Sequence, residues 1–144
     1  GIIRTPFLDD GYQKIAFAQE PMIAATRNPP DSWPPRFLSD LQDQPLILYR
    51  RFEAILIQAC RQQGFEPRIR CINDDARTTL LWADAGLGIA LVPQSALNLI
   101  DSRALVTAAL EEPGLVTQIC VVWLDRKKLS RIARAFVTAL TKST

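Results

Sequence analysis

The chain contains no histidine among its 144 residues. Histidine is the most common general base in enzymes and the most common metal ligand in proteins, so its absence removes both roles together. The sequence also lacks the GxSxG motif of serine hydrolases and the phosphate-binding GxxxxGK[ST] loop. We therefore expect no catalytic residues, no metal site and no cofactor.

Cysteine is scarce as well. The three cysteines, Cys60, Cys71 and Cys120, are far apart and form no CxxC pair, which leaves zinc-ribbon and thioredoxin-like sites without support. Each lies in an apolar stretch, as packing cysteines of a reduced protein do, so we expect a cytoplasmic protein. No secretory signal is visible, and no apolar run approaches the ~20 residues that a membrane helix needs, so we expect no membrane contact.

The sequence also has no large excess of positive or negative charge. The formal net charge is +2, which is too small to predict binding of this chain to nucleic acid or to a membrane surface. Apolar residues make up 48% of the chain and charged residues 22%, the balance of a soluble globular domain with a substantial core.

The most informative stretch that is present is 83–93, ADAGLGIALVP. Gly86 stands where a helix ends and a positive φ is needed, and Gly88 allows two backbones to approach closely. Residues 89–92 form an apolar run of strand length that Pro93 ends. A helix that leads directly into a buried strand predicts an α/β fold.

The remaining pattern agrees with that fold class. Strands are expected at 1–4 (buried), 12–26 (with a sheet edge or a bend at Pro21), 45–49, 68–72, 104–107 and 116–124, and helices at 52–63, 76–84 and 129–140. The 52–63 helix has one apolar face, formed by Phe52, Ile55, Leu56, Ala59 and Cys60. Such a face packs in a core or contacts a second subunit, and the sequence leaves both open.

Polar side chains follow three of the expected strands. They are Arg4 and Thr5 after the first, Tyr49 to Arg51 after the third, and Asn73 with Asp74 after the fourth. Ligands of open α/β sheets bind outside the carboxyl ends of strands, so these groups predict a pocket for a carboxylate or a small hydroxylated molecule. Singly, each is more typical of a solvated strand end or a cap than of a ligand contact, and only the convergence of three strand ends favours a pocket. For Asp74 and Asp75, helix capping is favoured over paired acid–base catalysis.

Several of these segments, in order, resemble the effector-binding domain of LysR-type transcriptional regulators. The most specific string is GLGIALVP at 86–93; GFEP at 64–67, EPMIAA at 20–25 and VVWL at 121–124 are individually weaker. The resemblance covers essentially the whole chain. RTPF at 4–7 and YRRFE at 49–53 suggest the branch near regulators of acetoin or fermentation operons.

The resemblance implies a two-lobed fold of the type 2 periplasmic-binding-protein kind, with a small effector in the inter-lobe cleft. On this template, 1–18 and 119–144 form part of lobe I, and 19–118 form lobe II. The winged helix-turn-helix and the start of lobe I are missing, so the first lobe is expected to be incomplete. The implied effector contacts are Arg4, Thr5, Tyr49, Arg50, Arg51, Phe52 and Asn73. The implied dimer contacts are Phe52, Ile55, Leu56 and Ala59.

The sequence is thus interpreted as a ligand-sensing domain rather than an enzyme. Its expected partners are a small-molecule effector, further copies in a dimer or tetramer, and DNA bound through a domain outside this chain. A solute-binding protein of the same fold is the alternative, although three unpaired cysteines oppose an exported protein. A small α/β enzyme domain is a further alternative, opposed by the missing histidine and phosphate loop.

Overall fold

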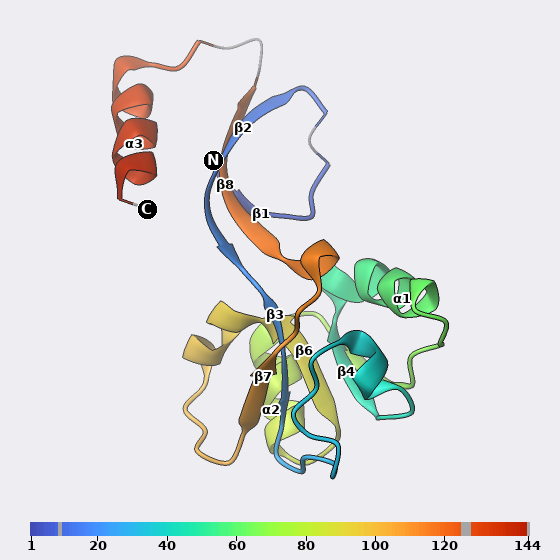
Figure 1. Cartoon of the computed structure of the whole chain (residues 1–144). Helices are drawn as coiled ribbons and strands as arrows, with labels where there is room; N and C mark the ends of the chain where they lie inside the picture. Colours follow the sequence, from blue (N-terminus) through green and yellow to red (C-terminus); the bar gives the residue numbers. More distant parts are fainter. Residues whose placement is uncertain (9, 125–127, 144) are drawn as a thin grey trace. The chain divides into compact units, whose positions relative to one another are not determined.

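The computed structural model describes residues 1–8, 10–124 and 128–143. The chain divides into two compact units, and it passes from one to the other twice (Figure 1). Unit 1 comprises Gly1–Glu20 and Thr117–Thr144, and unit 2 comprises Pro21–Val116. The described residues include no helix that is both long enough and apolar enough to cross a membrane.

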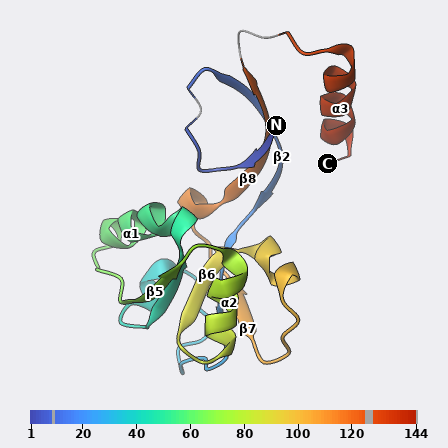
Figure 2. The same cartoon turned by 180° about the vertical axis from the view of Figure 1, so that it is seen from behind.

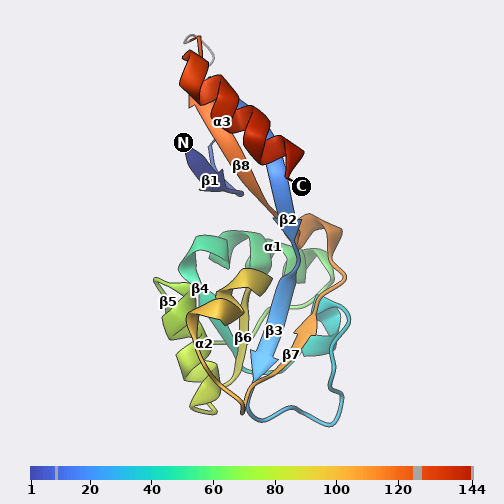
Figure 3. The same ribbon diagram turned by 90° about the vertical axis from the view of Figure 1, so that its left-hand side faces the viewer.

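Unit 1 is a small antiparallel sheet with one helix. Its elements are β1 (Ile2–Arg4), β2 (Tyr12–Glu20), β8 (Thr117–Leu124) and α3 (Arg131–Lys142). The strand order is β1-β8-β2, so β8 is central and pairs on both sides. The helix runs along one side of this sheet (Figure 3). It begins at Ser130, whose hydroxyl accepts a hydrogen bond from the backbone N–H of Ala133 at 3.2 Å.

Unit 2 is a mixed five-stranded sheet of order β5-β4-β6-β3-β7. Its elements are β3 (Met22–Thr26), η1 (Leu38–Leu41), β4 (Leu46–Tyr49), η2 (Arg50–Phe52), α1 (Glu53–Gln62), β5 (Ile69–Asn73), α2 (Ala76–Asp84), β6 (Ile89–Pro93), η3 (Gln94–Leu99), β7 (Val106–Ala109) and η4 (Pro113–Leu115). β4 is parallel to β5 and β6, whereas β3 is antiparallel to β6 and β7.

The two faces of this sheet carry separate apolar cores. Along β4, Leu46 and Leu48 pack with residues of α1, while Ile47 packs with residues of α2 on the other face. The alternation follows from the strand geometry, in which successive side chains point to opposite faces. Figure 2 shows α2 lying over the sheet near β6. Parallel strands covered on both faces by helices confirm the predicted α/β class.

The glycine motif acts as its sequence predicts. Gly86 has φ +85° and ends α2, where residues with a Cβ are disfavoured. At Gly88 a Cβ would lie 2.6 Å from the carbonyl oxygen of Pro45. That carbonyl accepts a hydrogen bond from the N–H of Ile89 at 2.8 Å, so the absence of a side chain at Gly88 lets β6 join β4.

Two expectations about burial and position are wrong. For Pro21, where a sheet edge or a bend was expected, the structure shows a break: Pro21 separates β2 from β3, which belong to different sheets, and β3 is an inner strand. The first strand is not buried: Ile2 is 56% exposed, since β1 is an edge strand that pairs only with β8. The expected strand at 104–107 lies two residues later, as β7, where its register with β3 sets it.

Candidate functional site

The candidate site of unit 2 lies where β4 and β5 end. These strands are parallel and pair Tyr49 with Asn73, so the two side chains come from neighbouring positions at one edge of the sheet. Both are partly exposed. A phenol and a carboxamide that share an edge offer hydrogen-bond donors and acceptors to a small polar molecule. The structure therefore brings these two predicted ligand residues together.

Arg50 joins this group and is held by acidic neighbours. Its Nε donates a hydrogen bond to Oδ1 of Asp74 at 2.5 Å, and its Nη1 lies 3.8 Å from Oε2 of Glu53. The hydrogen bond and the charge of Asp74 raise the pKa of Arg50. Sequence reasoning did not predict the Arg50–Asp74 pair. One feature of the sequence could have indicated this pair. Asp74 follows Asn73 and Arg50 follows Tyr49, so parallel pairing of Tyr49 with Asn73 brings the charged residues close together.

The aromatic residue expected as a pocket wall belongs to the core instead. Phe52 is 1% exposed, so its role as an effector contact or a dimer contact is corrected by the structure. Its ring meets that of Tyr49 edge-on, with centroids 5.4 Å apart and planes at 70°. The guanidinium of Arg51 lies over the same ring at 5.9 Å. Phe52 is thus a core residue that packs against Tyr49 and Arg51.

Arg4 and Thr5 form a second group of predicted ligand residues, within unit 1. Arg4 forms an ion pair with Glu20 and donates to the hydroxyl of Thr117 at 2.9 Å. These bonds link β1, β2 and β8. Thr5 is bonded to Gln118 twice: its N–H donates to the Gln118 carbonyl at 2.8 Å, and its hydroxyl accepts from the Gln118 N–H at 2.9 Å.

Asp75 is a helix cap, as its position predicts. Its carboxylate accepts hydrogen bonds from the backbone N–H of Thr78 at 2.7 Å and from the Thr78 hydroxyl at 2.8 Å. These bonds favour the ionised form and lower the pKa of Asp75. The described residues contain no cluster of three or more candidate metal ligands.

The predicted subunit face of α1 is divided by the structure. Leu56 is buried in the core, which removes it from any contact with a partner, whereas Ile55 and Ala59 remain partly exposed. Both line a groove of about 240 Å³ between α1 and η4. The full lining is Ile55, Gln58, Ala59, Gln62, Gln63, Glu112, Gly114 and Leu115.

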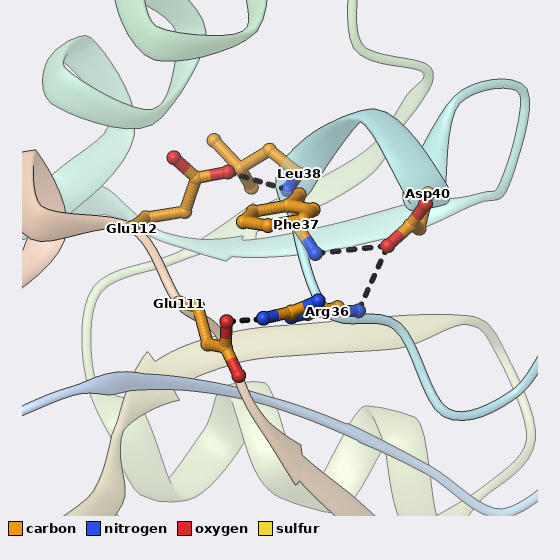
Figure 4. A network of polar contacts seen from close by, with 6 residues as sticks. All are labelled: Arg36, Phe37, Leu38, Asp40, Glu111 and Glu112. Carbon is orange, nitrogen blue, oxygen red and sulfur yellow. Dashed lines mark hydrogen bonds and ion pairs between the residues drawn. The ribbon is translucent and has the colours of Figure 1, made fainter.

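One wall of this groove is fixed by a polar network. The Glu112 carboxylate accepts hydrogen bonds from the N–H of Leu38 at 2.7 Å and from Nε2 of Gln63 at 3.0 Å. Beside it, Glu111 accepts from Nε of Arg36 at 2.6 Å (Figure 4). The network ties the segment before β8 to the C-terminal end of α1 and to the proline-rich segment that follows β3.

The cysteines are all free. Cys60 and Cys120 are buried, as expected for packing residues, and Cys71 is partly buried beside Asn73. Burial is the main cause that raises the pKa of the Cys60 thiol to about 11, with smaller contributions from Glu112 and Glu66. A neutral buried thiol behaves as a small apolar side chain.

Comparison with known families decides the classification. The family model described as LysR substrate binding domain matches residues 1–144. The chain belongs to the LysR substrate-binding domain family. It is 25% identical over 103 residues to YwbI, an uncharacterized HTH-type transcriptional regulator of Bacillus subtilis (strain 168), and this match covers 69% of the chain and 34% of YwbI.

Solved structures show the same fold for this LysR substrate-binding domain. CbnR, a LysR family transcriptional regulator, superposes with a TM-score of 0.79 at 24% identity, covering 99% of the chain and 51% of CbnR. The BenM effector binding domain with its effector benzoate superposes with a TM-score of 0.75 at 21% identity, covering 100% of the chain and 71% of that domain. The chain therefore spans a third to a half of the full-length regulators that it resembles.

Proposed function

We propose that this LysR domain senses a small polar effector and passes the signal to a DNA-binding domain elsewhere in the full-length regulator. The observation that carries the proposal is the pairing of Tyr49 with Asn73, which gathers a phenol, an amide and the Arg50 guanidinium at one sheet edge. These groups suit a carboxylate or a short hydroxylated molecule. The benzoate bound to the BenM effector binding domain is an example of a small carboxylate.

At the same end of the sheet, where β4, β5 and β6 finish, lie the start of β3 and the end of β7. These are the places where the chain enters unit 2 and turns back toward unit 1. Met22 pairs with Pro93, and the N–H of Gln94 donates to the Pro21 carbonyl at 3.2 Å. The N–H of Leu110, just after β7, donates to the Met22 carbonyl at 3.0 Å. An effector bound at this edge would therefore act next to the connecting segments. It would shift the populations of two arrangements by its different affinity for each.

Thr5 is proposed as an effector contact in unit 1, because a hydroxyl that accepts one hydrogen bond can still donate another. Arg4 is proposed chiefly as a positioning residue, since its guanidinium already bonds Glu20 and Thr117. Arg51 is proposed as a cation near the effector, beside Arg50.

The proposal extends to the whole protein. Membership of a regulator family supports the proposal that the full-length protein forms a homo-oligomer, binds DNA through another domain, is located in the cytoplasm and is not an enzyme. The family match also disfavours the alternative of a solute-binding protein for transport. Assignment to the acetoin branch rests on two short strings and remains a prediction.

Lobe I is proposed to be incomplete in this chain. Its α3 helix exposes Ile132 at 83% and Phe136 at 50%. Unit 1 also exposes Ile2, Tyr12 and Leu124. Large apolar side chains exposed on so small a unit are typical of surface that other residues cover. We therefore propose that further parts of the full-length protein pack on unit 1.

The effector proposal is tested by thermal shift of the full-length regulator against short carboxylates, including benzoate, and acetoin-like hydroxy compounds. We expect at least one class to raise the melting temperature. Asn73→Ala and Thr5→Val should then weaken binding of that compound about tenfold, as loss of a hydrogen bond to a ligand does. Asp31→Asn, an exposed change at the loop after β3, is the matched control. Equal binding of the compound by wild type and all three variants would refute the assigned site.

A further inference from the structure

We propose that Asp74 competes with the anionic group of the effector for Arg50: its carboxylate pairs with Arg50 until a ligand carboxylate takes its place. This inference rests on the proposed function of the β4–β5 edge as an effector site. It assigns a selectivity role to a residue that makes no contact with ligand, and it names the ligand class as anionic.

The competition follows from the parallel register of the two strands. Because Tyr49 pairs with Asn73, the residues that follow them, Arg50 and Asp74, emerge side by side at the same edge. The chain then places the Arg50 Nε 2.5 Å from the Asp74 Oδ1. Glu53, the first residue of α1, lies 3.8 Å from the same guanidinium. Arg50 therefore meets two carboxylates before any effector arrives.

The pair is accessible, which makes exchange possible. The Arg50 side chain is 59% exposed and that of Asp74 is 83% exposed. An exposed ion pair is weak because water screens both charges and both side chains lose freedom. Breaking it should cost an incoming ligand a factor of at most about five in affinity. A carboxylate can recover this cost through charge-assisted hydrogen bonds to the guanidinium, whereas a neutral hydroxy compound cannot.

Arg4 does not provide an equivalent receptor. Its side chain is 23% exposed and its partner Glu20 is 14% exposed, and it also bonds the Thr117 hydroxyl. Separating that pair would leave a partly buried carboxylate without its cation, which is costly. Of these two arginines, Arg50 is thus the one whose acidic partner can be exchanged at small cost.

The experiment uses acetate as the probe, so that it does not depend on knowing the effector. The Arg50 Nε–Hε resonance of the 144-residue chain is followed by NMR during acetate titration, in wild type, Asp74→Asn and Asp31→Asn. Arg50→Gln assigns the resonance. We expect the midpoint for Asp74→Asn to fall about twofold to fivefold below that of wild type. Asp31→Asn makes the same charge change in the loop after β3 and should match wild type.

The outcomes separate this proposal from the one on which it rests. Equal midpoints for wild type and Asp74→Asn overturn the competition, even where an effector is found. A lower midpoint for both aspartate variants assigns the effect to net charge and also overturns it. Failure of every compound to stabilise the full-length regulator refutes the sensing function, while the acetate titration still reports whether Asp74 competes for Arg50. Retained amide spectra show that each variant is folded.

Discussion

At the scale of single residues, burial decides which predicted roles survive. Phe52 and Leu56 were expected at a subunit contact, yet both lie in the core cluster with Leu48 and Cys60. Ile55 and Ala59, from the same predicted face, remain at the groove. Apolar residues at helical spacing show which side of a helix is apolar. They do not show how much of that side the rest of the fold covers, so the sequence could not separate core from interface.

This division predicts unequal costs for two similar truncations. Leu56→Ala should lower the free energy of unfolding by about 3 kcal/mol, because it leaves a cavity in a packed core. Ile55→Ala should cost no more than about 1 kcal/mol, since its side chain is partly exposed. Urea unfolding followed by tryptophan fluorescence measures both. Similar losses in the two variants would contradict the assignment of Leu56 to the core.

The cysteines give a second prediction at this scale. Cys71 should react with a thiol reagent at pH 8 in the native protein, because its side chain is partly exposed. Cys60 should react only after unfolding, since it is buried and its thiol has a pKa of about 11. The raised pKa also contributes stability that is complete below the ordinary value of 9.0 and is lost as pH rises toward 11.

The rate of modification of each thiol is measured by mass spectrometry after tryptic digestion, with Cys71→Ser as the control. Fast modification of Cys60 in the folded Cys71→Ser protein would show that the α1 side of the core is open.

At the scale of elements, α2 is the segment whose bounds the sequence predicted best. Its limits, Ala76 and Asp84, match the expected 76–84 because both ends have local signals. Asp75 caps the N-terminus through Thr78, and Gly86 ends the helix in a conformation with positive φ. The helix α3 lies two residues later than expected because Ser130 supplies its cap.

Capping by Asp75 predicts a pH-dependent effect. Asp75→Ala should destabilise the protein at neutral pH, because the N–H of Thr78 loses its acceptor. The pKa of Asp75 lies below its ordinary value of 3.8 in the folded state. Its charge therefore stabilises the fold above that value, and the contribution is lost as pH falls through the folded pKa.

The difference in unfolding midpoint between wild type and Asp75→Ala should thus narrow as the pH is lowered from 7 toward 3. Asp31→Ala, an exposed aspartate outside any helix, serves as the control. A constant difference across that range would argue against a carboxylate cap.

At the scale of the whole molecule, the two units differ in how well they cover their apolar residues. Unit 2 has a separate core on each face of its sheet. Unit 1 leaves Ile2, Ile132 and Phe136 exposed on a three-stranded sheet and one helix. Small layers of this kind bury little surface by themselves. Unit 2 should therefore be the more stable part of this chain.

The exposed apolar residues of unit 1 predict association of the 144-residue chain. Sedimentation velocity should show concentration-dependent oligomers, because self-contact removes these side chains from water. Ile132→Glu should reduce the association without loss of folding, as the side chain is almost fully exposed. Arg131→Glu makes a larger charge change at the neighbouring position and is the control. A monomeric wild type at all concentrations would contradict the proposal that unit 1 needs a cover.

The sequence by itself determined the α/β class, the bounds of α2, the glycine junction before β6 and the resemblance to the LysR family. Each of these depends on residues close together in the chain, where capping groups and backbone freedom act locally. Only the tertiary structure decided that Arg50 meets Asp74, that Phe52 and Leu56 are core, and that Ile132 is exposed. These outcomes depend on strand register and on which surfaces meet, and residues far apart in the sequence fix both.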